Sequence, residues 1–367
     1  MSDSRVGGGP RGHFAAVYRV VEEAIAAQAF PGCAFGALAG GAVVLQDAAG
    51  HFSYSAESPA VGPATAFDLA SVTKVVATTA AAMLLVERGR LDVDRKLGEY
   101  LSEFVAHRSA NDPARTITLR HLLAHSSGLP GYVEFFRTTP DHDALLRVCC
   151  NLHLGTEPGT RAEYSDPGFI LLGRVIEICA GERLDEFAQR EIFAPLGLSS
   201  TCFNPPLAMR AAIPPTEVDE KFRHRRIQGE VQDENAWVLG GVAGHAGLFS
   251  NVPDLLRFAG AILGVAQRRS AASWLRPETI EMFAQRQAPA GSSRALGWDT
   301  PSEKSSSGRY FSPRSIGHLG YSGCSLWIDL DAAVATVLLT NRTWPDRGSQ
   351  LIKQVRPAFH NAVREAL

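Results

Sequence analysis

The chain has 367 residues, of which 36 are basic and 38 acidic, and its net charge is −2. Hydrophobic residues make up 45% of it and charged residues 20%, a composition that excludes bulk disorder. Because no basic field is present to attract a phosphate backbone, nucleic acid is not an expected partner. The most apolar run, residues 75–86, is shorter than the about 20 apolar residues that cross a bilayer, so no membrane span is expected.

The compartment is predicted from the first residues and from the cysteines. Residues 1–10 lack the apolar stretch that a secretory signal needs, which predicts a cytoplasmic protein. The 6 cysteines are scattered without a CxxC pair, so neither a disulfide framework nor a zinc knuckle is expected. We interpret them as reduced thiols.

A helix and two strands are predicted at the N-terminal end. Apolar residues recur with a helical period over residues 13–29, and Pro31-Gly32 ends that pattern. Short apolar runs at Cys33–Ala39 and Ala42–Gln46 flank a Gly-Gly pair, which is typical of a hairpin.

The middle of the chain, from about residue 70 to 240, shows helical patterns separated by long loops. The predicted helices are Ser71–Arg88, Leu119–His125, His142–Cys150, Phe169–Ala180 and Leu184–Ile192. This section is therefore predicted to form a mostly helical lobe.

Strand patterns return near the C-terminal end. Gly323–Leu330 and Ala333–Asn341 are predicted strands. A helix over Pro253–Leu263, capped by Asn251, precedes them, and a helix over Leu351–Val363 follows. Strand-rich ends around a helical middle predict one α/β lobe, about residues 13–68 plus 241–367, with a helical lobe inserted at about 69–240.

Ser71 and Lys74 form the strongest local signal for chemistry. Three residues apart on the first turn of a helix, their side chains project to one face and can hydrogen-bond. A serine hydroxyl attacks well only when a neighbour takes its proton, and the apolar surroundings are expected to lower the pKa of the lysine enough for that task. N–H groups at this helix start, including that of Ser71, can also bind an oxyanion.

Two later segments supply possible partners for this pair. Tyr164 precedes a predicted helix, so its phenol lies on a loop and can relay a proton. His318 opens the segment His-Leu-Gly-Tyr-Ser-Gly, which leads into a predicted strand. Glycines there, Gly320 among them, let a substrate approach the strand edge, where the N–H of Tyr321 is a second candidate oxyanion donor.

Three motifs together resemble those of a known family. Ser71-Val72-Thr73-Lys74, Tyr164-Ser165-Asp166 and His318-Leu319-Gly320 are similar in order and spacing to the SxxK, YxN and K/H-x-G motifs of the penicillin-recognising serine hydrolases. That family includes class C β-lactamases, D,D-peptidases, D-aminopeptidases and lactamase-like esterases. The resemblance covers roughly residues 14–365. It implies a β-lactamase/transpeptidase-like α/β (α+β) fold, with an antiparallel sheet flanked by helices, in one catalytic unit over residues 1–367.

The resemblance also implies a role for each matching residue. Ser71 would be the acylated nucleophile and Lys74 its proton acceptor. Tyr164 would shuttle the proton to the leaving group and activate the deacylating water. The N–H groups of Ser71 and Tyr321 would form the oxyanion hole.

Two positions depart from the usual motifs. Asp166 stands where asparagine is usual, which replaces an amide donor toward the substrate by an acceptor. His318 stands where β-lactamases have lysine, so the charge that meets a substrate carboxylate is expected to come from an imidazole that titrates between about pH 6 and 7. Both departures predict weak or absent β-lactam turnover.

Other candidate residues have more than one possible role. His121 and His125 lie four apart, as metal ligands on a helix do, but no HExxH glutamate separates them, so no metal or cofactor is expected. His245, in a glycine-rich loop, either borders the substrate pocket or bonds loop carbonyls. Asp233 either binds a substrate amine or is a solvated loop acid.

The expected function is that of a serine hydrolase that forms an acyl-enzyme and cleaves an amide or ester. Its expected partner is a small-molecule or short peptide substrate, such as a D-amino-acid peptide or a carboxylic ester. The alternative is a non-catalytic sensor or binding protein of the penicillin-binding type. An α/β-hydrolase is excluded because no GxSxG elbow is present, and a phosphate-binding loop because no GxxxxGK[ST] is present.

Overall fold

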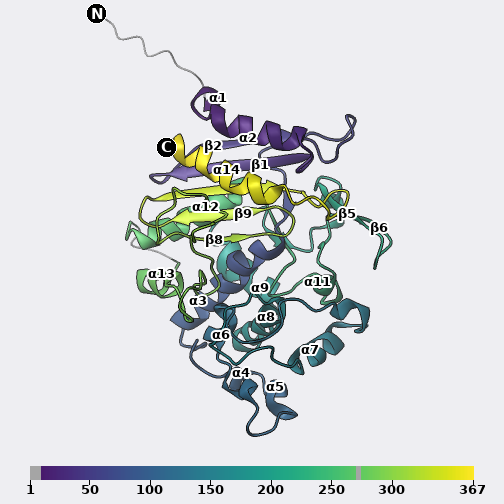
Figure 1. Cartoon of the computed structure of the whole chain (residues 1–367), viewed down its shortest axis with the longest axis vertical. Coiled ribbons are helices and arrows are strands. Elements are labelled where there is room, and N and C mark those ends of the chain that lie inside the picture. The colour runs from purple at the N-terminus through teal and green to yellow at the C-terminus, as the bar shows by residue number, and fades with distance from the viewer. Residues whose placement is uncertain (1–9, 270–273) are drawn as a thin grey trace, which may run out of the picture.

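A computed structural model describes residues 10–269 and 274–367, and Figure 1 shows its elements. Residues 1–9, to which the expected absence of a secretory signal largely refers, lie outside the described residues. The centre is a five-stranded antiparallel sheet in the order β2-β1-β10-β9-β8. Its strands are β1 (Gly32–Ala39), β2 (Ala42–Gly50), β8 (Ile316–Leu319), β9 (Ser325–Asp329) and β10 (Val334–Thr340).

Helices cover both faces of this sheet, because its central strands are apolar on both sides. One face packs against α2 (Ala15–Ala26) and α14 (Ile352–Glu365), which lie together in Figure 1. Their core contains Val17, Phe35 and Phe359. The other face packs against α12, whose Val252 would lie 2.6 Å from a Cβ at Gly36, so only glycine permits this close approach. The helices of this region are α1 (Pro10–His13), α2 (Ala15–Ala26), α12 (Val252–Ala266), α13 (Pro277–Ala284) and α14 (Ile352–Glu365).

The middle of the chain is mostly helical and occupies the lower part of Figure 1. Its first elements are η1 (Ala70–Val72), η2 (Lys74–Thr79), α3 (Ala80–Glu87), α4 (Leu97–Tyr100), α5 (Glu103–Ala106), η3 (Pro113–Thr116) and α6 (Leu119–Leu123). The remaining ones are η4 (Phe135–Arg137), α7 (His142–Cys150), α8 (Asp166–Ala180), α9 (Leu184–Ala188), η5 (Gln189–Phe193), α10 (Leu207–Arg210) and α11 (Glu234–Val238). The buried face of α8 lies at the centre of this region.

Two small sheets join the helical region to the rest of the chain. One has the order β3-β7-β4 and consists of β3 (Phe67–Asp68), β7 (Leu248–Ser250) and β4 (Cys202–Phe203). The other is the hairpin of β5 (Pro215–Asp219) and β6 (Arg225–Gln228). The predicted lobe boundaries near residues 68 and 241 stay a prediction. β4, which belongs to the predicted helical section, pairs with β7 of the predicted α/β lobe.

The predicted α/β fold class with an antiparallel sheet is confirmed, and most predicted elements are present. The capping role of Asn251 is also confirmed, because its Oδ1 accepts the N–H of Asp254 at 3.0 Å. The sequence predicts no strand at β8, only a segment from His318 that leads into one. β8 is nevertheless an edge strand, because pairing with β9 holds a short, glycine-containing segment extended.

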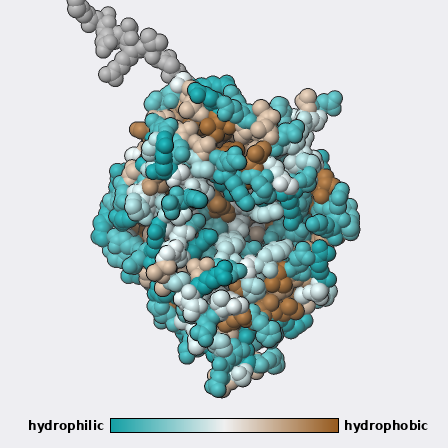
Figure 2. Space-filling view, in the orientation of Figure 1, coloured by the Kyte–Doolittle hydropathy of each residue, from teal (hydrophilic) through white to brown (hydrophobic). Residues whose placement is uncertain are grey.

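The helix that begins at the nucleophile motif, Ala70–Glu87, is long and apolar enough to cross a membrane by length and composition. It lies inside the protein, with 83% of its residues buried, as core helices of soluble folds do. The face in Figure 2 is mostly hydrophilic, with hydrophobic residues in small separate areas.

Candidate active site

The nucleophile motif begins at a sharp backbone turn. Ala70 has a positive φ of 45°, which is rare for a residue with a Cβ. Its N–H donates to Asp68 Oδ1 at 2.8 Å, and a second Asp68 oxygen accepts the N–H of Gln232 at 2.7 Å. The carboxylate of Asp68 therefore ties the turn to the loop that precedes α11.

The hydroxyl of Ser71 receives two hydrogen bonds from predicted site residues. Lys74 Nζ donates to Ser71 Oγ at 3.0 Å, and Tyr164 Oη donates to the same oxygen at 2.8 Å. Ser71 and Lys74 therefore lie on one face of the helix and hydrogen-bond, as the sequence predicts. The helix starts as a 3₁₀ turn at Ala70 and continues from Lys74 as a wide π-helical turn.

Lys74 is fully buried, and three acceptors surround its ammonium group. Besides Ser71 Oγ, these are Asp166 Oδ1 at 2.7 Å and the carbonyl oxygen of His245 at 3.0 Å. Burial alone would lower the pKa of Lys74, but the Asp166 carboxylate and Tyr164 outweigh it and raise the pKa above its usual value. The expectation that apolar surroundings lower this pKa is therefore wrong, because the departure at position 166 places a carboxylate beside the ammonium.

Tyr164 lies on the loop before α8, as its position in the sequence predicts. Ser165 caps that helix, with Oγ accepting the N–H of Gly168 at 3.1 Å. Burial, followed by the Asp166 carboxylate, raises the pKa of Tyr164, while Lys74 opposes this rise. The phenol is therefore protonated in the resting site.

His125 holds Tyr164 in place, a role that the sequence interpretation missed. Its ring is 4.6 Å from the Tyr164 ring, centroid to centroid. Its carbonyl oxygen accepts the N–H of Glu163 at 2.8 Å and its Nδ1 accepts the N–H of Ser165 at 3.0 Å, so it binds the residues on both sides of Tyr164. The available signal was the segment His125-Ser126-Ser127-Gly128. The four-residue spacing between His121 and His125 pointed instead to a possible pair of metal ligands.

A cavity of about 690 Å³ opens beside these groups. Most of the predicted site residues border it, namely Ser71, Tyr164, Asp166, His318, Gly320 and Tyr321. Lys74 lies behind Ser71 and outside the lining. The fold therefore brings residues that are up to 250 positions apart to one wall.

In the turn between β8 and β9, the N–H of Tyr321 is free of bonds to any described residue and lies beside the cavity. Within the described residues the N–H of Gly320 bonds Cys324 O at 2.7 Å, whereas the N–H of Tyr321 has no partner. A Cβ at Gly320 would lie 2.3 Å from the carbonyl oxygen of Leu69. Glycine is required there because the turn packs on Leu69, just before the nucleophile motif. The sequence pattern predicted a different reason, the close approach of a substrate.

His318 does not provide the charge that the sequence interpretation assigned to it. It is 3% exposed, and its Nδ1 is 2.8 Å from the carbonyl oxygen of Leu319. Burial, followed by the positive charges of Lys74 and Arg294, lowers the pKa of His318 well below 6.5. The imidazole is therefore neutral at pH 6 to 7, and the expected titration in that range is wrong.

His245 lies behind the cavity wall rather than on it. Its Nε2 is 2.9 Å from Asp233 Oδ1, and its carbonyl oxygen accepts from Lys74. Asp233 borders the cavity and also caps α11 by accepting the N–H of Ala236 at 2.8 Å. Burial would raise the pKa of Asp233, but His245 and the cap lower it to about 2. The solvated-acid interpretation of Asp233 is therefore wrong.

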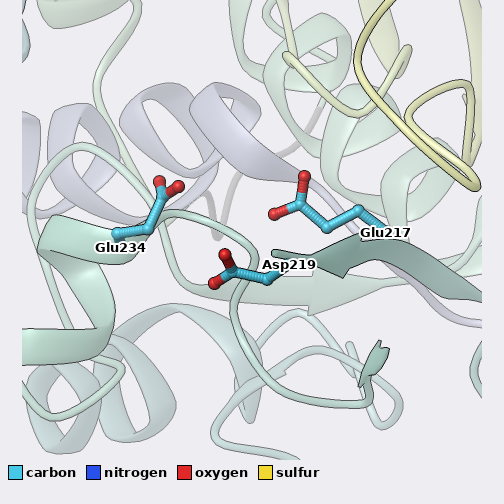
Figure 3. A group of neighbouring side chains, drawn as sticks. All are labelled: Glu217, Asp219 and Glu234. Atoms are coloured by element: carbon cyan, nitrogen blue, oxygen red, sulfur yellow. The ribbon is translucent and has the colours of Figure 1, made fainter. Parts of the chain in front are cut away.

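Three carboxylates near the cavity have the spacing of metal ligands. Glu217, Asp219 and Glu234 offer oxygens that lie within 4.8 Å of one another, and Figure 3 shows their carboxylates turned toward a common point. Arg347 donates to Glu217 at 2.6 Å and to Glu234 at 2.7 Å, and Arg223 donates to Asp219 at 2.9 Å. These five residues, here called the acid–arginine cluster, are paired with each other, and two of them, Glu234 and Arg347, border the cavity.

Comparisons with known proteins agree with this architecture. The sequence pattern of the family described as Beta-lactamase matches residues 17–356. An N-acetylmuramyl-L-alanine amidase of Bacillus subtilis (strain 168) is 31% identical, over 89% of this chain and 80% of its own length. A putative D-alanyl-D-alanine carboxypeptidase of Escherichia coli O157:H7 is 32% identical, over 76% of this chain and 69% of its own.

The fold is also found in solved structures. EstCE1, a hydrolase with promiscuous acyltransferase activity, superposes with a TM-score of 0.76 at 23% identity, over 96% of this chain and 99% of its own. A structural match at that identity establishes the shared fold, whereas the sequence matches establish the family. The chain belongs to the β-lactamase family of serine hydrolases.

Proposed function

We propose that this chain forms an acyl-enzyme on Ser71 and cleaves an amide or ester through a Ser71–Lys74–Tyr164 centre. The observation that carries this proposal is the pair of hydrogen bonds to Ser71 Oγ, 3.0 Å from Lys74 Nζ and 2.8 Å from Tyr164 Oη, at the wall of an open cavity. A serine with an activating partner in a cavity is the usual arrangement for nucleophilic catalysis.

Tyr164 serves as the proton relay in this proposal. Ser71 Oγ attacks the acyl carbon, the Oγ–H proton passes to Tyr164 Oη, and the original Tyr164 proton passes to the leaving nitrogen or oxygen as its bond to the acyl carbon breaks. In deacylation, water gives one proton to Tyr164 and its hydroxide to the acyl carbon, and Tyr164 returns a proton to Ser71. Neither half-reaction needs a deprotonated lysine or tyrosine at the start. This agrees with the raised pKa values of Lys74 and Tyr164, which keep both groups protonated.

Lys74 then acts as a fixed positive charge. Its ammonium group donates to Ser71 Oγ, so it stabilises negative charge that develops on that oxygen and on the phenol during proton transfer. Asp166 keeps the ammonium protonated. The N–H groups of Ser71 and Tyr321 are the proposed oxyanion hole, and the free N–H of Tyr321 supports this assignment.

The proposed substrates are D-amino-acid peptides or simple carboxylic esters. Relatives of the chain are named as an amidase and as putative D-alanyl-D-alanine carboxypeptidases, which favours amides. β-Lactam turnover is expected to be weak, because the Asp166 carboxylate accepts from Lys74 and has no N–H to donate to a substrate carbonyl, and because His318 is neutral.

The test is hydrolysis of p-nitrophenyl butyrate by the purified chain and by Ser71→Ala. The substitution should lower kcat/KM by about 10³-fold or more and leave the Tm within a few degrees. Ser302→Ala, an exposed serine of the neighbouring hollow, is the matched control and should stay within about twofold of the unmodified chain. A fluorophosphonate should label Ser71, and mass spectrometry that locates the adduct elsewhere would overturn the assignment.

A sensor would behave differently in the same experiment. It would form a stable adduct at Ser71 with a fluorescent penicillin and turn over neither esters, D-alanyl peptides nor nitrocefin. That result would replace the hydrolase proposal by the penicillin-binding alternative.

A further inference from the structure

Asp68 holds the strained turn directly before the nucleophile. It is the last residue of β3 and is 2% exposed. Its Oδ1 accepts the N–H of Ala70 at 2.8 Å, one residue before Ser71. Ala70 has a φ of 45°, a backbone conformation that costs free energy for a residue with a Cβ. The Asp68 carboxylate therefore stabilises the turn from which the N–H of Ser71 is presented.

The main-chain carbonyl of Asp68 holds the turn between β8 and β9. Ser322 Oγ donates to this carbonyl oxygen at 2.7 Å, and the thiol of Cys324 donates to it weakly at 3.6 Å. Ser322 is fully buried and directly follows Tyr321, whose N–H has no partner in the described part of the chain. One buried residue thus contacts both segments that carry the N–H groups of the proposed oxyanion hole.

A third segment binds the second carboxylate oxygen of Asp68. Asp68 Oδ2 accepts the N–H of Gln232 at 2.7 Å, so both oxygens accept from main-chain N–H groups. The charged side chains that act on this carboxylate are Asp233, at the start of α11, and Arg223, in the β5–β6 hairpin. Burial, together with Asp233, raises the pKa of Asp68 to about 6, although the two N–H groups and Arg223 oppose this rise. The nearby thiol of Cys324 stays neutral, because burial raises its pKa to about 11.

We infer that Asp68 positions the oxyanion hole, aligning the N–H groups of Ser71 and Tyr321, and that it does so fully only as a carboxylate. The inference rests on the proposed function and adds to it a residue that touches neither the substrate nor the reacting atoms. A carboxylate accepts with both oxygens, whereas protonation converts one of them into a donor. The N–H of Ala70 or of Gln232 then loses its acceptor, and a displaced oxyanion hole stabilises the developing negative charge less well.

Activity and stability should respond in opposite directions when Asp68 takes up a proton. Because its pKa is raised to about 6, kcat should fall as the pH drops below about 6. An aspartate of the unfolded chain has a pKa of about 3.9, so the folded state binds this proton more tightly. The stability that this group contributes is therefore present at low pH and is lost as the pH rises through about 6. Loss of activity through Asp68 is thus separable from acid unfolding.

The test measures kcat and KM for p-nitrophenyl butyrate, together with the Tm, from about pH 4.5 to 8. In the unmodified chain kcat should fall about tenfold per pH unit below about pH 6, with KM little changed. Asp68→Asn should lower kcat at about pH 8 by about 10- to 100-fold and abolish the acid decline, because asparagine accepts with one oxygen and does not titrate. Ser322→Ala should lower kcat about tenfold but keep the acid decline, because it removes only the bond to the Asp68 carbonyl.

Two further variants separate positioning from a general loss of stability. Asp254→Asn is the matched control, because Asp254 is 1% exposed and its Oδ2 accepts the N–H of Ser200 at 2.7 Å outside the cavity lining. It should lower the Tm and keep both kcat and the acid decline. Ala70→Gly, added to Asp68→Asn, should restore kcat several-fold, because glycine adopts a positive φ without the cost that the carboxylate offsets.

The Tm supplies a readout that does not depend on catalysis. The Tm deficit of Asp68→Asn relative to the unmodified chain should be larger at about pH 5 than at about pH 8, while the difference in kcat becomes smaller. An acid decline that persists in Asp68→Asn, or an unmodified chain whose kcat is constant down to about pH 5, would overturn the inference. If Asp68→Asn does not fold, then the profiles of the unmodified chain and of Ser322→Ala decide, and an undiminished kcat in Ser322→Ala counts against it.

The proposed function is tested separately in the same samples. Labelling of Ser71 by a fluorophosphonate and ester hydrolysis at about pH 8 report on the acyl-enzyme itself. An unmodified chain that shows neither would end both proposals. An active chain whose profile is superimposable on that of Asp68→Asn would end only this one.

Discussion

Two groups of charged side chains lie around the cavity, and they differ in whether their polar atoms are already used. In the acid–arginine cluster, Arg347 bonds Glu217 and Glu234. In the reactive centre, Lys74 binds Asp166 but also points at Ser71 Oγ, an oxygen that is exposed to the cavity. The first group joins the β5–β6 hairpin to α11 and the C-terminal region, while the second leaves an atom available to a substrate.

This difference separates structural charge from chemical charge. A buried ion pair whose partners are all satisfied fixes the positions of elements and loses stability when one partner is removed. A buried charge that contacts a nucleophile changes the energy of a transition state instead. The metal-like spacing of the three carboxylates in Figure 3 therefore says less about function than the arginines that already bind them.

Lys74→Met should have the largest effect on activity. It removes the charge beside Ser71 Oγ, so kcat/KM for p-nitrophenyl butyrate should fall by about 10³-fold or more. The measurement is steady-state hydrolysis with circular dichroism to confirm folding. A folded variant that keeps a tenth of the activity would show that the ammonium group is not needed.

His125→Phe should lower kcat by about tenfold with little change in KM, because it keeps an aromatic ring against Tyr164 but leaves the N–H of Ser165 without its acceptor. The control is His121→Phe, which removes a bond to the N–H of Thr118 in the helix cap and does not touch Tyr164. The control should lose stability and keep its kcat. Equal losses of kcat in both variants would contradict the positioning role.

Asp166→Asn should change the pH dependence of the reaction. The Asp166 carboxylate raises the pKa of Lys74, so its removal lets burial lower that pKa. The ammonium group is then lost at lower pH, and the alkaline decline of kcat/KM should move to lower pH in the variant. Profiles from pH 6 to 11 with a neutral ester test this expectation, and superimposable profiles would show that Asp166 does not control the charge of Lys74.

Glu217→Gln should have the smallest effect on activity and a clear effect on stability. The side chain is 3% exposed and accepts two bonds of 2.6 Å from Arg347, so loss of its charge should cost about 1–3 kcal/mol of unfolding free energy in urea. Ester hydrolysis by the folded variant should stay within about twofold. A tenfold loss of activity in a stable variant would place the acid–arginine cluster in the reactive centre.

Local sequence pattern was sufficient for most of the fold. The two short apolar runs on either side of Gly40-Gly41 predicted the β1–β2 hairpin, and Asn251 predicted the start of α12. Order and spacing of three short motifs predicted that Ser71, Lys74 and Tyr164 meet, because a helical turn places the first two and the family resemblance places the third. Segments such as β8, with four residues, escaped because their extended shape depends on a neighbouring strand.

The charge of each site residue, by contrast, was decided by the tertiary structure. The sequence alone determined that a lysine follows Ser71 and that a histidine stands at position 318. Protonation depends on burial and on charges that arrive from distant parts of the chain. Asp166 lies 92 positions from Lys74 yet raises its pKa, and burial beside Lys74 and Arg294 keeps His318 neutral. Motif spacing fixes which residues meet, but only their packing fixes which of them carry charge when they do.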